Sequence, residues 1–407
     1  MAVFLGETFR PMRHRNYLLY WVGFLVSNAG AWIQSMAQGW LVYELSGSAA
    51  WLGAIGFVRA VPLILLSLVG GATADRFPIK RILHVTQTVM MLNAVTLGTL
   101  VSLEVVQVWH VIALSAVTAA AQAFDNPARQ ALVPSLVEKA DLHPAISLNA
   151  IAFNGAAVFG PSLAGVLVPI VGLAGCFYVN AASYGAVFLA LALMHFPAHQ
   201  PRIKRQSMGR DVLEGLRFIG TSPVILALTS MAALTSLLAR PYQQFILVFA
   251  KDVLAGQIGL AGIMQASPAL GTVIFMLSVA SLGNIQYKGK LLVGAGLGFC
   301  IAMISFAWSG NIYLSILLLI ITGGMNMTWQ TTLNTLLQTN TPDAMRGRVM
   351  ASYTITALGM MPLGQGPMGY TMERLGPQWA LTLGAALSGL WIAYMALVRV
   401  RKVPQLP

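Results

Sequence analysis

The chain has 407 residues, of which 57% are hydrophobic and 9% are charged, and its formal net charge is +12. A soluble domain carries about 25% charged residues. This composition therefore excludes an ordinary water-soluble protein and indicates one that lies mostly in a lipid bilayer.

Twelve long apolar segments predict twelve transmembrane helices. A helix that crosses a bilayer needs about 20 mostly apolar residues, whereas the strands of a membrane barrel alternate over roughly 10 residues. The segment lengths therefore predict an all-α integral membrane protein. In chain order, the segments cover residues 17–43, 49–74, 82–103, 109–133, 147–170, 174–196, 222–249, 257–281, 290–308, 312–337, 350–372 and 377–399.

The basic residues are concentrated at one set of segment ends. Twenty of the 24 Lys and Arg residues lie at these ends, which include both termini. Positive residues accumulate on the cytoplasmic side of a membrane, so we expect a multi-pass protein of the cytoplasmic membrane with both termini in the cytoplasm. This distribution accounts for the net charge by contact with membrane lipids, and we expect no nucleic-acid partner.

The second half of the chain repeats the first. Gly53, Gly56 and Pro62 recur 206 residues later, and Gly160 and Gly165 recur 204 residues later as Gly364 and Gly369. We therefore predict two six-helix halves, residues 1–196 and 222–407, joined by a cytoplasmic linker, residues 197–221, which can include an amphipathic surface helix. Duplicated halves in an apolar chain indicate a transporter with its site between them.

Polar residues inside the predicted spans mark the helices that line a water-filled path. Such residues are costly in lipid and face protein or a cavity. In the first, fourth, seventh and tenth segments they share one helix face; the alternative is interhelical hydrogen bonding without water. With Arg59 from the second segment, the predicted cavity residues are Gln34, Gln38, Arg59, Gln122, Asn126, Ser236, Arg240, Gln243, Asn326 and Gln330.

Arg59 and Arg240 are isolated guanidinium groups inside predicted spans. On a cavity wall, each can bind a carboxylate, a catecholate or a phosphate in fork geometry. The alternative is backbone capping beside Pro62 and Pro241, or packing between helices. The functional interpretation predicts anionic or polar neutral substrates.

Asp125 is the one carboxylate well inside a predicted span, and Arg129 follows it by one helical turn. Residues at positions i and i+4 share a helix face, so the two side chains can pair. One interpretation is a structural ion pair or a gate. The other is that Asp125 takes up and releases a coupling proton.

Three stretches resemble the major facilitator superfamily. Gly71-Ala-Thr-Ala-Asp75-Arg76, followed by Lys80 and Arg81, resembles its loop signature, with Pro78 where a glycine is usual. Gly160-Pro161-Ser-Leu-Ala164-Gly165 resembles the glycine-proline motif of exchangers, with Ala164 in place of a glycine. Arg15-Asn16 and the stretch 40–48 are similar to the enterobactin-exporter-like and macrolide-efflux-like branch, the transmembrane secretion effector type.

The resemblance implies the major facilitator fold and alternating access. It implies that the first stretch is a conformational latch, although plain positive charge at the membrane surface is the alternative, and that Gly160, Pro161 and Gly165 form a helix-packing motif. It also implies proton-driven export of a siderophore, a macrolide-like compound or another amphiphile. Import or facilitated passage of a small anionic metabolite, and a non-transporting receptor or lipid-binding scaffold, stay open as alternatives.

The sequence carries no HExxH, GxSxG, P-loop or CxxC motif. We therefore expect no enzyme, no catalytic residue, no metal site and no cofactor. Without a nucleotide site, uphill transport must draw on an ion gradient, so the expected partners are a small-molecule substrate and protons. We expect a monomer.

Overall fold

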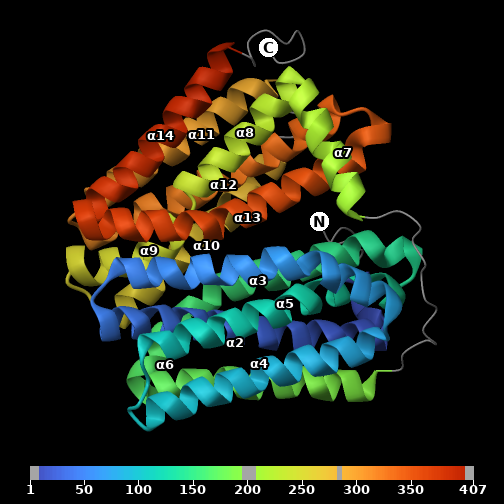
Figure 1. Cartoon of the computed structure of the whole chain (residues 1–407), viewed down its shortest axis with the longest axis vertical. Helices are drawn as coiled ribbons and strands as arrows, with labels where there is room; N and C mark the ends of the chain where they lie inside the picture. The colour runs from blue at the N-terminus through green and yellow to red at the C-terminus, as the bar shows by residue number, and fades with distance from the viewer. Residues whose placement is uncertain (1–8, 195–207, 282–286, 399–407) are drawn as a thin grey trace. The chain divides into compact units, whose positions relative to one another are not determined.

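A computed structural model describes residues 9–194, 208–281 and 287–398, and all regular elements in these ranges are helical (Figure 1). This confirms the predicted all-α class. The predicted boundary at residues 196 and 197, and the basic residues at 202, 204, 205, 399, 401 and 402, lie outside the described residues. The α-helices are α2 (Arg15–Ser46), α3 (Ala49–Arg76), α4 (Ile79–Ser102), α5 (Val108–Leu136), α6 (Leu142–Leu193), α7 (Met208–Thr221), α8 (Pro223–Leu238), α9 (Tyr242–Val248), α10 (Ile258–Ser281), α11 (Lys288–Ala307), α12 (Ile312–Asn340), α13 (Asp343–Leu375) and α14 (Pro377–Val398).

Nine helices of the described ranges are long and apolar enough to cross a membrane. One of these stretches is the 55-residue region Lys139–Leu193, which contains α6. At Gly172 in α6 the backbone leaves the helical region with φ 72°, a conformation that glycine adopts at little cost. The two arms of α6 on either side of Gly172 correspond to the predicted segments 147–170 and 174–196. The count of twelve crossings stays a prediction.

The chain divides into two compact units, which we describe separately. Among the described residues, the first unit holds α2, residues 58–76 of α3, and α4 to α6; the second holds residues 47–57 and α7 to α14. Apolar side chains form the core of the first unit, where Tyr17, Leu83, Leu132 and Leu148 are almost fully buried. The predicted boundaries of the two halves stay a prediction.

Two repeated glycines make equivalent helix contacts, one in each unit. A Cβ atom added to Gly160 in α6 would overlap with Trp32 in α2. A Cβ atom added to Gly364 in α13 would overlap with the backbone of Leu237 in α8. Because α2 and α8 begin the two copies of the sequence repeat, the same glycine of each copy packs against the first helix of its own copy. A duplicated structural unit predicts this equivalence.

In the second unit, the start of α3 packs closely against α13. The carboxylate of Glu373 in α13 accepts hydrogen bonds from the hydroxyl of Ser48 and, at 3.3 Å, from the backbone amide of Ala50. A carboxylate at a helix N-terminus satisfies free amides and interacts favourably with the helix dipole. Side chains at Gly53 and Gly369 would collide with the facing backbone, so glycine permits this close contact.

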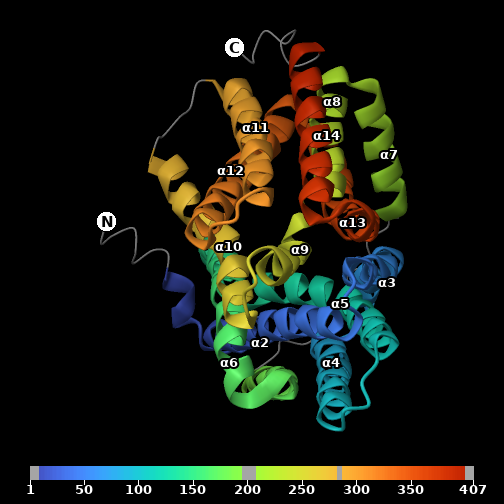
Figure 2. The same ribbon diagram turned by 90° about the vertical axis from the view of Figure 1, so that its left-hand side faces the viewer.

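The predicted linker contributes one helix, α7, which packs against α13 and α8 (Figures 1 and 2). Gly215 meets the Arg348 carbonyl and the Ser352 hydroxyl, and Glu214 pairs with Arg348 at 3.1 Å. Leu213 and Leu216 stay exposed on the other side of α7. Arg217 is exposed on the same side, so the outer surface of α7 combines apolar side chains with a basic one, as an amphipathic helix at a membrane surface does.

The contact of Gly160 with Trp32 predicts an asymmetric effect of two similar substitutions in α6. Gly160→Ala should lower the apparent unfolding temperature of the purified protein, because overpacking costs about 1–3 kcal/mol. Gly155→Ala is the matched control, since a Cβ atom there meets nothing within 4 Å and alanine favours a helix. Equal unfolding temperatures for the two variants, measured by tryptophan fluorescence in detergent, would contradict the proposed packing.

Candidate functional site

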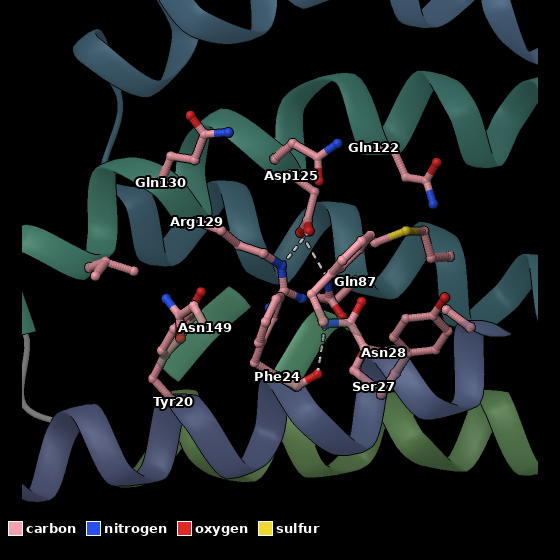
Figure 3. Close-up of a pocket in the computed structure, with 16 residues that line it drawn as sticks. Tyr20, Phe24, Ser27, Asn28, Gln87, Gln122, Asp125, Arg129, Gln130 and Asn149 are labelled. Atoms are coloured by element: carbon pink, nitrogen blue, oxygen red, sulfur yellow. Dashed lines mark hydrogen bonds and ion pairs between the residues drawn. The ribbon is translucent and has the colours of Figure 1, made fainter. Parts of the chain in front are cut away.

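The first unit contains a cavity of about 260 Å³, lined by residues of α2, α4, α5 and α6 (Figure 3). Such a volume suits a small molecule or part of a larger one. Aromatic rings supply much of the wall, together with a set of polar side chains. The aromatic residues are Tyr20, Phe24, Phe153 and Tyr184, and the main polar ones are Ser27, Asn28, Gln87, Gln122, Asp125, Asn126, Arg129, Gln130 and Asn149.

Asp125 lies buried on the wall of this cavity and receives three side-chain hydrogen bonds. Its Oδ1 atom accepts from Thr86 Oγ1 and from Gln87 Nε2, both at 2.7 Å. Its Oδ2 atom accepts from Arg129 Nε at 2.5 Å. Figure 3 shows Arg129 and Gln87 converging on the Asp125 carboxylate from different helices. All three bonds are donated to the carboxylate, so both of its oxygens have partners.

Arg129 completes an ion pair that is almost excluded from water. The exposed fractions of the Arg129 and Asp125 side chains are 11% and 6%. The guanidinium also lies over the ring of Phe24, with 5.5 Å between its central carbon and the ring centroid. Removing one partner from a buried pair typically costs about 3–5 kcal/mol, since the other charge is left without a counter-ion. The cavity wall therefore holds two charges that sum to zero.

Pro127, between the two charged residues, shapes the helix that carries them. Proline has no amide hydrogen, so the carbonyl of Ala123 loses its usual helical partner. Gly70 of α3 packs directly against this carbonyl, and a Cβ atom at position 70 would overlap with it. The glycine therefore lets α3 approach α5 two residues before Asp125.

The predicted cavity residues of the first unit fall into two groups. Gln122 and Asn126 line the cavity, and Arg59 donates to Gln122 Oε1 at 3.3 Å. Gln34 accepts a bond of 2.6 Å from Asn180 in α6, and Gln38 donates one of 2.6 Å to Ser115 in α5. These two bonds join helices, as the alternative interpretation expects. The role of all five residues in substrate binding stays a prediction.

In the second unit, the predicted cavity residues lie in α8, α9 and α12 and in the break between α8 and α9. Ser236 is in α8, and Arg240 lies in the break between α8 and α9, where its Nη1 atom is 3.5 Å from the Ser236 hydroxyl. Gln243 is in α9, and its backbone carbonyl accepts a bond of 2.9 Å from Gln265. Asn326 and Gln330 follow one another by one turn in α12, the first buried and the second half-buried.

The stretch predicted to be a conformational latch is mostly helical. α3 continues through Arg76 and α4 begins at Ile79, so only two residues connect them. Gly71, Asp75 and Lys80 are half-buried, whereas Arg76 and Arg81 are exposed. The latch itself stays a prediction. In the glycine-proline motif, Gly160, Pro161 and Gly165 are all buried in α6.

Sequence reasoning missed two of the three donors to Asp125. Thr86 and Gln87 lie in α4, whose segment was not among those with a clear polar face. One signal was present, because Thr86, Gln87 and Asn93 are polar residues within a predicted span. Asn93 also bonds to α5, at 2.6 Å from the Thr118 hydroxyl, so α4 and α5 share a polar contact surface.

Residue spacing also did not identify a second buried carboxylate, Asp141, because it lies in a connection between predicted segments. It pairs with Arg10 at 3.0 Å and with His14 at 2.8 Å. These contacts join the short helix η1 (Arg10–Arg13) to η2 (Lys139–Asp141). Asp141 therefore holds the chain before α2 against the connection between α5 and α6. Within the described ranges, no group of three His, Cys, Asp or Glu residues could hold a metal ion.

The fold is shared with solved transporters. A structure of the nucleoside transporter NupG superposes with a TM-score of 0.73 at 14% sequence identity, covering 94% of this chain and 98% of that one. At this identity the similarity shows the fold alone.

The chain belongs to the transmembrane secretion effector family of the major facilitator superfamily, whose family description matches residues 6–406. It is 26% identical to the staphyloferrin A transporter of Staphylococcus aureus, over 82% of this chain and 84% of the relative. It is 23% identical to the multidrug efflux pump Tap of Mycolicibacterium fortuitum (92% and 90%) and 24% identical to the enterobactin exporter EntS of Citrobacter koseri (84% and 82%). The protein is therefore a multi-pass membrane transporter of small molecules and not an enzyme, and the predicted family and branch are confirmed.

The geometry of the ion pair predicts strong coupling between its two members. Arg129→Gln should destabilise the protein by about 3–5 kcal/mol, because it leaves the Asp125 charge buried and unpaired. The double variant Asp125→Asn/Arg129→Gln should be more stable than Arg129→Gln alone. Gln130→Ala, at an exposed position of the same cavity, is the control and should change little. Additive effects of the two single substitutions on the unfolding temperature would show that the pair is not coupled.

Proposed function

We propose that this protein exports a small organic compound across the cytoplasmic membrane in exchange for protons. The relatives support this proposal, since their names describe an enterobactin exporter, a multidrug efflux pump and a staphyloferrin A transporter. The substrate class that they have in common is a small organic molecule, either a siderophore or a drug-like amphiphile.

The observation that carries the proposal is the buried carboxylate of Asp125 on the wall of a cavity. Ionisable groups in membrane spans are costly and usually serve ion or substrate pathways. Asp125 lines the cavity, so its carboxylate can take up a proton from the cavity and release it there. Thr86, Gln87 and Arg129 donate to both of its oxygens while the pair is intact, so proton uptake requires that this arrangement loosens.

The charge of the pair determines the sign of coupling. Protonation of Asp125 removes the counter-ion of Arg129, so the charge of the pair rises from zero to +1. A cationic group bound beside the intact pair is therefore disfavoured by the proton, and such competition between substrate and proton is the requirement for antiport. A substrate anion that bound Arg129 would instead favour protonation of Asp125, and the two would move in the same direction.

The cavity wall favours a substrate with a flat or apolar body and several hydrogen-bonding groups. The exposed aromatic ring of Phe153 offers a face for stacking. The amides of Gln122, Asn126 and Asn149 can each donate and accept. A polar siderophore and an amphiphilic drug both satisfy these requirements.

Transport follows from alternating access of two six-helix halves, with both termini in the cytoplasm. In this account Gly160, Pro161 and Gly165 provide the packing surface of α6 against α2. Gly71, Asp75, Arg76, Lys80 and Arg81 stabilise one of the two states. The transporter acts as a monomer in contact with membrane lipids, and the coupling ion is the proton.

Asp125→Asn should abolish export while the protein still reaches the membrane, since the amide cannot exchange the coupling proton. Cells with the wild-type protein, Asp125→Asn, the control Glu104→Gln or no transporter would be compared by untargeted analysis of retained compounds. Glu104 is an exposed carboxylate of the first unit that does not line the cavity. The compound depleted by the wild type and by Glu104→Gln should be retained with Asp125→Asn.

The same comparison separates the other functions. A compound enriched by the wild type would indicate import. No difference between the wild type and cells without the transporter would favour a receptor or a lipid-binding scaffold. Normal depletion by Asp125→Asn would remove Asp125 from proton coupling.

A further inference from the structure

Arg240 lies in the break between two consecutive helices of the second unit, α8 and α9. α8 ends at Leu238 and α9 begins at Tyr242, with Pro241 between Arg240 and the new helix. The backbone amides of Ala239 and Arg240 both donate to the Thr235 carbonyl at 3.0 Å. Among the described residues the Arg240 side chain bonds to no backbone carbonyl, since its one hydrogen-bond partner is the Ser236 hydroxyl, so capping does not account for the guanidinium at this position.

The guanidinium of Arg240 has few partners. Its Nη1 atom lies 3.5 Å from the Ser236 hydroxyl, at the limit of a hydrogen bond, and its Nε atom is buried without an acceptor. None of the ion pairs found within residues 9–194, 208–281 and 287–398 involves Arg240. Arg129, by contrast, has a carboxylate at 2.5 Å. A half-buried cation without a counter-ion is a position that favours an anion.

The surroundings of Arg240 are aromatic and neutral. Tyr242 and Tyr353 lie close enough to interact with its charge, and both are buried. Tyr242 packs edge-on against Phe299, with 6.1 Å between the ring centroids. Low polarity around a charge strengthens its attraction for an opposite charge.

Further polar atoms without partners lie on the facing helices α10 and α12. Gly271 meets the Ile320 carbonyl and Gly323 meets the Pro268 carbonyl, so the two helices pack closely in an antiparallel register. The same register places Gln265 opposite Asn326. The side-chain oxygens of both residues are buried without a donor, as is the Trp329 Nε1 atom without an acceptor.

These atoms belong to the same region as Arg240. Gln265 donates to the backbone carbonyl of Gln243, three residues after Arg240. Trp329 packs against Gly296 in α11, one turn before Phe299, which contacts Tyr242. Acceptors without donors, in the same region as a cation without a counter-ion, fit a ligand that combines a negative group with hydroxyl or amide donors.

We infer that Arg240 binds an anionic oxygen group, such as a carboxylate or a phosphate, of the exported compound. This inference rests on the proposed function and names the substrate class. An anion held by Arg240 also leaves Arg129 paired with Asp125. Antiport of an anionic substrate then stays possible.

The test compares two probes of nearly the same shape. Salicylate carries a carboxylate and a hydroxyl, whereas salicylamide carries the same hydroxyl and a neutral amide. Binding of both to the purified full-length protein in phosphatidylcholine nanodiscs would be measured by equilibrium dialysis. The wild type should bind salicylate roughly tenfold more tightly than salicylamide, since a charge-assisted hydrogen bond is stronger than a neutral one.

Substitutions of Arg240 test whether this side chain causes the preference for salicylate over salicylamide. Arg240→Gln should abolish the preference, and Arg240→Lys, which keeps the charge without the fork, should retain part of it. Arg217→Gln removes an exposed charge of the same unit and should leave the preference unchanged. The binding measurement uses no proton gradient, so the failure of anion binding and the failure of proton-coupled export are distinguishable.

Three outcomes would overturn the inference. The first is equal binding of salicylate and salicylamide by the wild type, a result that does not depend on the folding of any variant. The second is an unchanged preference in folded Arg240→Gln. The third is loss of salicylate binding when phosphatidylglycerol replaces part of the phosphatidylcholine, because the anion at Arg240 would then be a lipid headgroup.

Discussion

The carboxylate of Asp125 must remain buried in a membrane protein, and this constraint organises the first unit. Thr86 and Gln87 from α4 and Arg129 from α5 supply the three donors that make the burial possible. Each donor must lie at hydrogen-bonding distance, so α4 and α5 have to pack in one register. A small shift between these helices would break the bonds from Thr86 and Gln87 and leave Asp125 with Arg129 alone as its donor.

Small residues permit the helix contacts around this arrangement. Gly70 lets α3 reach the Ala123 carbonyl, which Pro127 has freed from the helix. Gly160 lets α6 meet α2, the helix that carries Tyr20 and Phe24 to the cavity wall. In lipid, helices associate through such close contacts and through polar bonds, because there is no hydrophobic driving force between them.

The positions of the helices can be predicted well from the sequence, whereas the hydrogen-bonding partners of polar side chains on different helices cannot. Apolar length alone gives helix positions close to those observed, such as 82–103 for α4 and 377–399 for α14. The pairing of Asp125 with Arg129 is also predictable, since both lie on one helix at i and i+4.

Contacts between helices are not visible in residue spacing. Spacing places Gln34 and Gln38 on one face of α2, but it does not tell whether that face meets a cavity or Asn180 and Ser115. Thr86 and Gln87 reach Asp125 only through the packing of α4 on α5. The unpartnered state of Arg240 likewise depends on which residues the fold brings near it.

The central claim is that substrate and proton compete at Asp125. The most direct test counts the protons released when the exported compound binds the purified transporter in weakly buffered detergent solution. The wild type should release protons as the compound binds, and Asp125→Asn should release none. Proton uptake by the wild type, or equal release by both proteins, would contradict the account.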